Sequence, residues 1–297
     1  MRSDSSPFGT SGILQMQKFA NYEYFEKIGQ GTFGAIYKGR NVRTDETVVV
    51  KMEPFDLSAG FSSLKHESNM LNILYSKKCR NIPPTYWYGT ISEPPRRVLV
   101  MPYYEEPLQS IQITSAKMAA KIMQSAILIL QHIHEKYVVH RDIKPANFMI
   151  HNDELVLIDF GLATFYVDSN ERHISNTAKK ENIIGTPKYA SWNIHCGEEY
   201  SRRDDLMSVV YIGLFLIYGD SLWNPPPQVS SSADKKDKSS LLHPLNRWFK
   251  TKKTLANIAE LLTPWTELMT LARHIYVLSF QERPSYSEYI ELFSKTI

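Results

Sequence analysis

The 297-residue sequence has little of several features that define common classes of protein. It contains only two cysteines, Cys79 and Cys196, so neither a disulfide framework nor a cysteine-based zinc site is expected. The most apolar run, VVYIGLFLIYG at 209–219, is too short for a membrane helix and is predicted to be a buried helix. The N-terminal residues MRSDSSPFGTSG lack the apolar core of a signal peptide. We therefore expect a soluble, intracellular protein with no membrane partner, in the cytoplasm or also in the nucleus.

The chain also lacks a strong excess of charge of one sign. It has 34 Lys+Arg against 31 Asp+Glu, a net charge of +3, so the composition does not indicate general nucleic-acid binding. Hydrophobic residues make up 43% of the sequence and aromatic residues 12%, which is enough for a large core. This length and composition predict one large domain or two lobes.

The pattern along the chain divides into three parts. Residues 1–17 are predicted to be a flexible leader. Residues 18–104 are predicted to be rich in β-strands, and residues 105–297 are predicted to be mainly helical. The segment PPPQVSSSADKKDKSS at 225–240 is predicted to be an exposed loop. The fold class is therefore α+β, with a β-rich first lobe and a helical second lobe. Helices are expected at 62–78, 117–137, 204–219, 254–262, 265–278 and 285–295.

A glycine-rich turn lies in the β-rich part. The sequence IGQGTFGAIY supplies G-x-G-x-x-G at Gly29, Gly31 and Gly34, between two predicted strands. Without a Cβ, such a turn lets backbone N–H groups approach an anion such as a phosphate. The turn does not precede a helix, which counts against a dinucleotide-binding fold. The alternative is that the glycines serve only as turn residues.

The strand that follows carries a charged residue among apolar ones. Lys51 in VVVKME is expected to need a partner, and Glu67 on the predicted helix at 62–78 is the natural one. Together they could hold an ammonium group over phosphate oxygens. The alternative is a Lys51 that extends to solvent and a solvated Glu67.

Two further segments carry carboxylates next to apolar runs. In LVLIDFGLA, Asp159 ends a buried strand and needs a cation, which Mg²⁺ could supply together with the amide oxygen of Asn147. In VVHRDIKPANFMI, Pro145 disfavours a helix, so the polar group is predicted to lie on a loop. Asp142 could accept a proton from a hydroxyl there, and Lys144 could balance charge on a phosphoryl group. The alternative is a charged surface turn.

These elements follow one another in a fixed order: glycine turn, strand lysine, helix glutamate, H-R-D-x-x-x-x-N and D-F-G. In this order the chain resembles the protein kinases. Instead of A-P-E it reads GTPKYASWNIHCGEEYSRRDDL from residue 185, with Ser191-Trp192-Asn193 where A-P-E would fall. This segment, HRDIKPANF and ERPSY at 282–286 resemble the casein kinase I family. The resemblance covers roughly residues 22–295.

The resemblance implies a two-lobed protein-kinase fold and a non-specific serine/threonine protein kinase that transfers the γ-phosphoryl group of ATP with Mg²⁺. It assigns the catalytic roles to Asp142, Lys144, Asn147 and Thr186, and the metal to Asn147 and Asp159. Asp205 resembles the buried aspartate that steadies the catalytic loop. Among the implied ATP-binding residues, Ile28 and Ile36 lie beside the adenine, Met101 is the gatekeeper and Pro102 to Tyr104 form the hinge. The full set is Ile28, Gly29, Gln30, Gly31, Thr32, Phe33, Gly34, Ala35, Ile36, Lys51, Glu67, Met101, Pro102 and Tyr104.

The family prefers protein substrates that are acidic or already phosphorylated near the acceptor. Lys188 stands where the family has a basic residue of a phosphate pocket, and Lys179 and Lys180 add charge nearby. The alternative for these lysines is a solvated run. Ala146 departs from the family by replacing an acidic or polar residue before Asn147. The resemblance also implies activity without a phosphate on the activation segment. In many kinases, however, the arginine at the position of Arg141 pairs with such a phosphate.

Two other functions compete with a protein kinase. A scaffold with a kinase fold and little catalysis is one, but such proteins typically lose one of the residues represented here by Lys51, Asp142 and Asp159. A small-molecule phosphotransferase is the other, and GTPKYASWN argues against it because it resembles a segment that receives a polypeptide. No nucleic-acid partner is expected, and the sequence favours a monomer without fixing the oligomeric state.

Overall fold

The computed structural model of the chain describes residues 17–31, 34–55, 61–177, 179–230 and 239–296. These residues form two compact units, one containing the chain up to Lys65 and Thr85–Tyr103, the other containing His66–Pro84 and the chain from Tyr104 onward. The chain passes from one unit to the other at Tyr103–Tyr104, next to the predicted boundary at 104. Residues 66–84, which the sequence analysis placed in the first lobe, group with the second unit.

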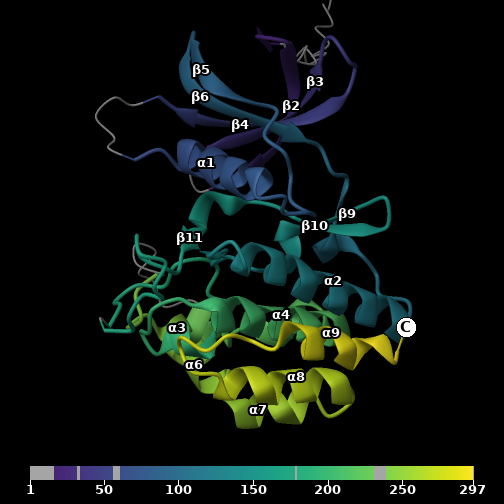
Figure 1. Cartoon of the computed structure of the whole chain (residues 1–297), viewed down its shortest axis with the longest axis vertical. Coiled ribbons are helices and arrows are strands. Elements are labelled where there is room, and N and C mark those ends of the chain that lie inside the picture. Colours follow the sequence, from purple (N-terminus) through teal and green to yellow (C-terminus); the bar gives the residue numbers. More distant parts are fainter. Residues whose placement is uncertain (1–16, 32–33, 56–60, 178, 231–238, 297) are drawn as a thin grey trace, which may run out of the picture. The chain divides into compact units, whose positions relative to one another are not determined.

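The first unit is a six-stranded antiparallel sheet in the order β1-β2-β3-β4-β6-β5 (Figure 1). Val48 and Val50 of β4 and Val98 and Val100 of β6 belong to its core and have no exposed surface. This burial matches the apolar sequences of β4 and β6, because strands inside a sheet bury their side chains against neighbouring strands. The strands are β1 (Gln17–Phe19), β2 (Tyr22–Gln30), β3 (Ala35–Asn41), β4 (Thr47–Pro54), β5 (Trp87–Ser92) and β6 (Pro95–Pro102).

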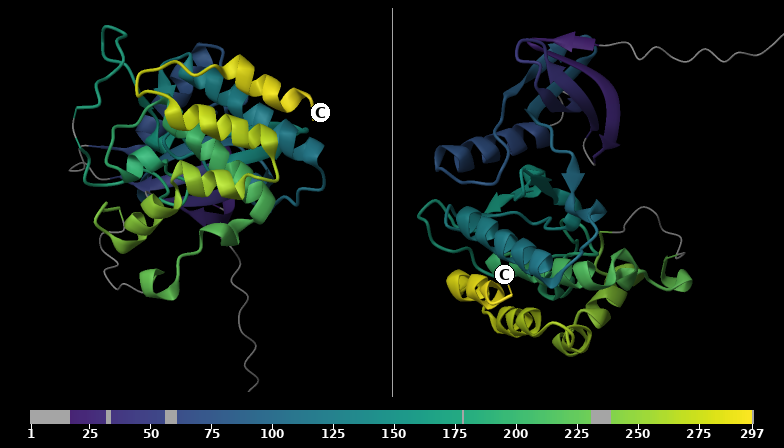
Figure 2. Two further views of the ribbon diagram at one scale, coloured as in Figure 1. Left: turned by 90° about the horizontal axis from the view of Figure 1, so that it is seen from below. Right: turned by 90° about the vertical axis from the view of Figure 1, so that its right-hand side faces the viewer.

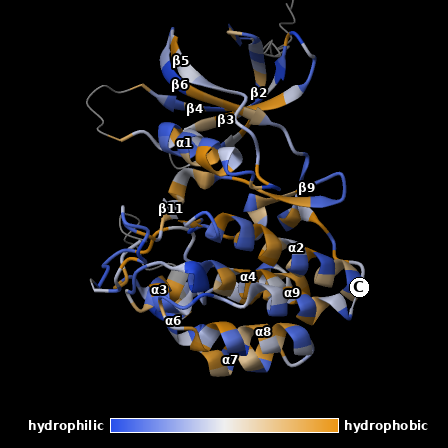
Figure 3. Cartoon of the chain, in the orientation of Figure 1, coloured by the Kyte–Doolittle hydropathy of each residue, from blue (hydrophilic) through white to orange (hydrophobic). Residues whose placement is uncertain are grey.

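The second unit is mainly helical. Its longest helix, α2, packs against α4 and α9, and α8 packs against α4, α7 and α9 (Figures 1 and 2). Hydrophobic and hydrophilic residues alternate around α7 and α8 in Figure 3, as expected for helices that bury one face. The helices are α1 (Ser63–Ser76, which begins in the first unit), α2 (Ala116–His134), α3 (Trp192–His195), α4 (Arg202–Tyr218), α5 (Pro227–Ser230), α6 (Pro244–Lys252), α7 (Leu255–Leu261), α8 (Thr266–Val277) and α9 (Tyr286–Ser294).

Short strands in the second unit frame the loops that carry the predicted chemistry. β9 (Phe148–His151) pairs with β10 (Glu154–Leu157) and with β7 (Glu106–Pro107), and β8 (Val138–Val139) pairs with β11 (Thr164–Phe165). β8 and β9 are the apolar flanks of the H-R-D loop. β10 is the apolar run before Asp159.

Some sequence expectations differ from the structure. Four residues of the predicted loop at 225–240, Pro227–Ser230, form helix α5 instead, and residues 231–238 of that loop lie outside the described residues. The leader predicted at 1–17 also lies outside the described residues, except for Gln17, which begins β1. Within the described part of the chain, no helix is long and apolar enough to cross a membrane.

Candidate active site

The H-R-D loop lies between β8 and β9, as the position of Pro145 predicted. Pro145–Asn147 form a single 3₁₀ turn that does not continue as an α-helix. Arg141 has a φ of 68°, in the left-handed region that non-glycine residues rarely adopt. Such strained backbone persists only where several contacts hold it, and it is often found at functional sites.

The Asp142 carboxylate receives four hydrogen bonds from three residues. Its Oδ1 accepts from the Thr186 main-chain N–H at 2.9 Å and from the Thr186 hydroxyl at 2.7 Å. Its Oδ2 accepts from Lys144 Nζ at 2.6 Å and from Asn147 Nδ2 at 3.2 Å. Lys144 Nζ also donates to the Thr186 hydroxyl at 3.0 Å. The structure therefore brings the four residues predicted to be catalytic into one cluster.

Gly185 allows Thr186 to come this close to the loop. It has a φ of +87°, and a Cβ at this position would lie 2.3 Å from the Arg141 carbonyl oxygen. Any other residue would strain its own backbone and push the two segments apart. The predicted proximity of Thr186 and Asp142 therefore depends on this glycine.

Asp205, near the start of α4, holds the main chain of the H-R-D loop. Its carboxylate accepts from the N–H groups of His140 at 2.8 Å and Arg141 at 3.0 Å, and His134 Nε2 lies 3.0 Å from it. Asp205 has no exposed surface. Burial by itself would raise the pKa of this carboxyl, but the hydrogen bonds outweigh it and keep the pKa below its ordinary value. Asp205 is therefore ionised and steadies the loop.

His134 is a site residue that the sequence analysis missed. Its Nδ1 lies 2.6 Å from the Tyr286 hydroxyl, and its carbonyl accepts from the Tyr166 hydroxyl at 2.6 Å. Burial lowers the pKa of His134, so the ring is neutral and orients Asp205 by a hydrogen bond. The only signal in the sequence was a histidine in the apolar run at 117–137, which does not reveal a partner 71 residues away.

Asp159 and Asn147 lie on adjacent segments. The N–H of Ile158 donates to the Asn147 carbonyl at 2.9 Å, and Asp159, the next residue, has a φ of 67°. Asn147 Nδ2 is used by Asp142, since it donates to the Asp142 carbonyl at 2.9 Å as well as to its carboxylate. The amide oxygen of Asn147 is thus the atom left to meet a cation.

The Arg141 side chain is held by the activation segment itself. Its Nε donates to the Leu162 carbonyl at 2.7 Å, and burial lowers the pKa of the guanidinium. Leu162 belongs to the 3₁₀ turn that follows Asp159. Activity without a phosphate on this segment stays a prediction.

The residues that replace A-P-E bind Asp204, the neighbour of Asp205. Asp204 accepts from the Ser191 hydroxyl at 2.5 Å, from Asn193 Nδ2 at 3.2 Å and from the Ser201 N–H at 2.8 Å. Burial is the main reason that the pKa of Asp204 rises to about 6. These bonds join the S-W-N segment to the S-R-R-D-D-L segment.

The glycine turn forms the β2–β3 hairpin in the first unit. Gln30 pairs with Ala35 and Gly29 with Ile36, and the Gly31 N–H donates to the Gly34 carbonyl at 2.8 Å. Two of the predicted ATP-binding residues, Thr32 and Phe33, lie outside the described residues. Ile28, on β2, is 41% exposed.

The other predicted nucleotide-binding residues belong to both units. Lys51 pairs with Ile36 across β3 and β4, Met101 is buried on β6, and Pro102 pairs with Val48. In the second unit, Glu67 is buried on α1, and the Tyr104 ring packs edge-on against His151 with centroids 5.2 Å apart. Lys51 and Glu67 thus lie in different units, and their ion pair stays a prediction.

Two of the three lysines predicted to bind phosphate have acidic partners. Lys188 Nζ lies 2.5 Å from the Asp220 carboxylate and donates to the Asp220 carbonyl at 2.9 Å. Lys180 Nζ lies 2.5 Å from the Glu199 carboxylate. Lys179 is exposed. A phosphate would have to compete with these ion pairs, which the sequence analysis did not foresee.

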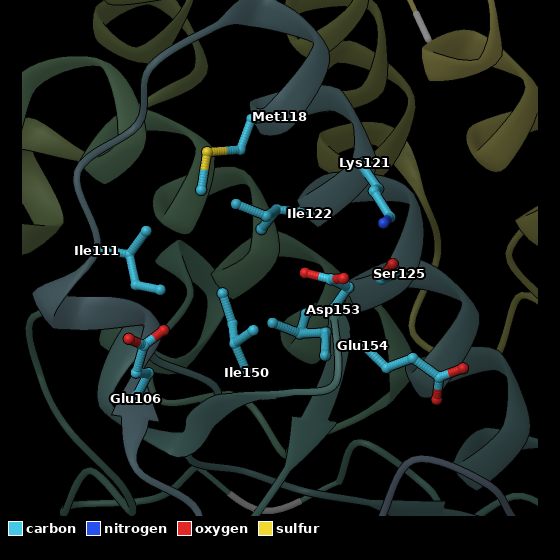
Figure 4. A pocket seen from close by; sticks show the side chains of 10 residues that line it. Glu106, Ile111, Met118, Lys121, Ile122, Ser125, Ile150, Asp153 and Glu154 are labelled. Atoms are coloured by element: carbon cyan, nitrogen blue, oxygen red, sulfur yellow. The ribbon is translucent and has the colours of Figure 1, made fainter.

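A cavity of about 310 Å³ lies apart from this cluster, between α2 and the β9–β10 hairpin. Figure 4 shows Ile111, Met118, Ile122 and Ile150 around it, with carboxylates among them. None of the predicted site residues lines it. Across the described residues, no group of three or more His, Cys, Asp or Glu side chains could hold a metal ion.

Comparison with known families bears on the fold of the chain. The protein kinase domain model matches residues 22–292. The chain therefore belongs to the protein kinase domain family. This also confirms the predicted α+β kinase fold, with its sheet in one unit and its helices mainly in the other.

A curated relative bears on the predicted resemblance to the casein kinase I family. Casein kinase I homolog 2 of Schizosaccharomyces pombe is 30% identical over 292 residues, which are 93% of this chain and 62% of the relative. The predicted resemblance to the casein kinase I family is confirmed by this match. The chain spans less than two thirds of the length of that relative.

Proposed function

We propose that this chain is an ATP-dependent serine/threonine protein kinase of the casein kinase I type. The observation that carries the proposal is the cluster of Asp142, Lys144, Asn147 and Thr186, in which every polar side chain is fixed by another. Catalysis of phosphoryl transfer needs mainly positioning and charge balance, and this cluster supplies both.

The geometry supports the following roles. Asp142, held by four hydrogen bonds, orients the acceptor hydroxyl and accepts its proton. Lys144 lies 2.6 Å from the Asp142 carboxylate and balances negative charge on the transferred phosphoryl group. Thr186 joins both residues to the segment that receives the polypeptide. Lys51 of the first unit would bind the phosphates of ATP.

The donor set fits magnesium. Mg²⁺ prefers one or two carboxylates together with phosphate oxygens and water, so a dedicated cluster of protein carboxylates is not required. Asp159 supplies one carboxylate, and Asn147 supplies an amide oxygen because its nitrogen is bound to Asp142. Bound there, the ion would neutralise charge on the phosphates.

The substrates we propose are proteins with acidic or phosphorylated residues near the acceptor. Lys188 supports this preference, because its neighbour Asp220 is an exposed side chain that a doubly charged phosphate could displace. Asp220→Asn should therefore increase the ratio of turnover on a phosphoserine-primed peptide to turnover on the unprimed peptide. Lys188→Met should lower it. A ratio that neither change alters would contradict this part of the proposal.

The central test is phosphorylation of a serine peptide library by the whole chain with ATP and Mg²⁺. Asp142→Asn should lower turnover by roughly two or more orders of magnitude and leave the fold intact. Asp153→Asn is the matched control, since Asp153 is exposed in the β9–β10 turn, where asparagine tolerates its φ of 61°. Wild-type protein that turns over no faster than Asp142→Asn would be a scaffold and not a kinase.

A further inference from the structure

Lys253, directly after α6, is a lysine with no exposed surface. A lysine is almost never fully buried unless its ammonium group is partnered. Its Nζ donates to the main-chain carbonyl of Ala190 at 2.6 Å and to that of Pro187 at 3.0 Å. Within the described part of the chain, the ion pairs of the structure give it no carboxylate. Its partners are therefore backbone oxygens of a distant segment.

Aromatic rings enclose the same ammonium group. Nζ lies 4.5 Å from the centroid of the Tyr211 ring, 4.9 Å from that of Phe249 and 5.7 Å from that of Trp223. Burial lowers the pKa of Lys253 well below its ordinary value, while the carbonyls and ring faces favour the charged form. The Tyr276 hydroxyl fixes the main chain here by donating to the Lys253 carbonyl at 2.8 Å.

The remaining neighbour is a histidine ring. His195 Nε2 lies 3.3 Å from Lys253 Nζ and 3.1 Å from the Pro187 carbonyl oxygen. Burial, and then the charge of Lys253, lower the pKa of His195 well below its ordinary value. The His195 ring is therefore neutral, and the N–H donors of Lys253 are directed at the two carbonyls.

Pro187 and Ala190 belong to the segment that meets the catalytic cluster. Thr186, the residue before Pro187, is bound to Asp142 by its N–H and its hydroxyl. The Tyr189 carbonyl accepts from the Ser208 hydroxyl at 2.8 Å. Residues 186–190 are thus held on one side by Asp142 and on the other by Lys253, with little freedom left between.

We propose that Lys253 is a positioning residue for the segment 186–190, which receives the polypeptide substrate. By holding the carbonyls of Pro187 and Ala190, it keeps Thr186 against Asp142 and keeps the surface of the segment in one shape. It touches no reacting atom, so it serves peptide substrates more than ATP. This inference rests on the proposed kinase function.

The test compares Lys253→Met with Lys252→Met in the whole chain. Methionine fills similar space without donors, and Lys252 is the exposed lysine one residue earlier, so the control removes an equal charge. For Lys253→Met we expect kcat/KM for a serine peptide to fall by about tenfold or more while KM for ATP stays within about twofold. Lys252→Met should match wild type in both quantities.

Two further measurements separate positioning from a general loss of stability. Amide hydrogen exchange of residues 186–190 should be faster in Lys253→Met and unchanged in Lys252→Met, and this readout does not depend on kinase activity. Lys253→Gln keeps two N–H donors and should recover part of the peptide kcat/KM. If the wild-type protein has no kinase activity, the proposed function is refuted. The hydrogen-exchange result would still decide whether Lys253 positions residues 186–190.

Wild-type peptide kinetics and wild-type exchange in Lys253→Met would overturn the proposal. A loss that affects KM for ATP as strongly as KM for the peptide would also overturn it, because that pattern indicates a general structural role. If Lys253→Met does not fold, Lys253→Gln carries the comparison, since its shorter reach should still raise KM for the peptide alone. Equal peptide KM in Lys253→Gln and wild type would then refute the inference.

Discussion

The strongest test of how the catalytic loop is held is Asp205→Asn. The Asp205 carboxylate, which has no exposed surface, accepts from two main-chain N–H groups and a histidine. In Asp205→Asn, an NH₂ group replaces one of the two carboxylate oxygens. This NH₂ group must then face either the main-chain N–H of His140 or that of Arg141. A main-chain N–H cannot turn round to accept a hydrogen bond, and the conflict therefore cannot be relieved by rotation.

The magnitude follows from this conflict. One charge-assisted hydrogen bond is lost and one buried N–H is left facing a donor, which together cost about 2.5 to 6 kcal/mol of the free energy of unfolding. The loss should also appear as faster hydrogen exchange at the amides of His140 and Arg141, and as a lower kcat, because Asp142 follows Arg141 directly.

Asp204→Asn is the matched control, one residue away on the same helix. The partners of Asp204 include the Ser191 hydroxyl and the Asn193 amide, and both of these groups can rotate to accept from an NH₂ group. Its pKa of about 6 also shows that charge is disfavoured there, so a neutral amide should cost no more than about 1.5 kcal/mol. Urea denaturation followed by circular dichroism measures both variants. Equal costs, or a cost below about 1 kcal/mol for Asp205→Asn, would refute the reasoning.

Three other outcomes are expected. Gly185→Ala should lower kcat by about tenfold or more in a peptide assay, because its Cβ would lie 2.3 Å from the Arg141 carbonyl; an active variant would show that the segment adapts. Protein treated with phosphatase should keep its turnover, and inactive protein after treatment would show that a phosphate is required. Stability measured by urea denaturation should fall when the pH drops from 7.5 to 5.5. The pKa values of His134 and His195 are lowered by folding from 6.5, so the unfolded chain takes up protons first. Each histidine therefore costs at most about 1.4 kcal/mol of the free energy of unfolding between pH 7.5 and 5.5. Asp204, whose pKa is raised from 3.8 to about 6, increases the free energy of unfolding over the same pH range, so the net loss of stability is smaller. Stability that rises on acidification would contradict the assignment of neutral histidines.

Much of the second unit could be predicted from periodicity. The helices expected at 117–137 and 265–278 are α2 (Ala116–His134) and α8 (Thr266–Val277), with ends that differ by one to three residues. The loop around Asp142 was predictable because Pro145 and its polar neighbours stand between two apolar runs. Local rules of this kind need no knowledge of distant segments.

The partners of buried charges could not be predicted in this way. Lys253 ends the run KTKK, which in a sequence is indistinguishable from a solvated lysine run, and its burial depends on rings from three separate segments. Lys188 was expected to be available for phosphate, but its partner Asp220 is 32 residues away on the chain. Contacts across such separations are set by tertiary packing and leave no local pattern.

The three glycines of the glycine turn, Gly29, Gly31 and Gly34, would respond differently to substitution by alanine. A Cβ on Gly34 would lie 1.9 Å from the Met52 carbonyl oxygen of the adjacent strand β4. Among the residues that the structure describes, a Cβ on Gly29 or Gly31 would meet nothing closer than 3.6 Å. Intolerance to substitution at Gly34 would therefore report on how the hairpin lies over β4. Gly29 and Gly31 are the positions at which an added methyl group would probe nucleotide affinity without first disturbing the sheet.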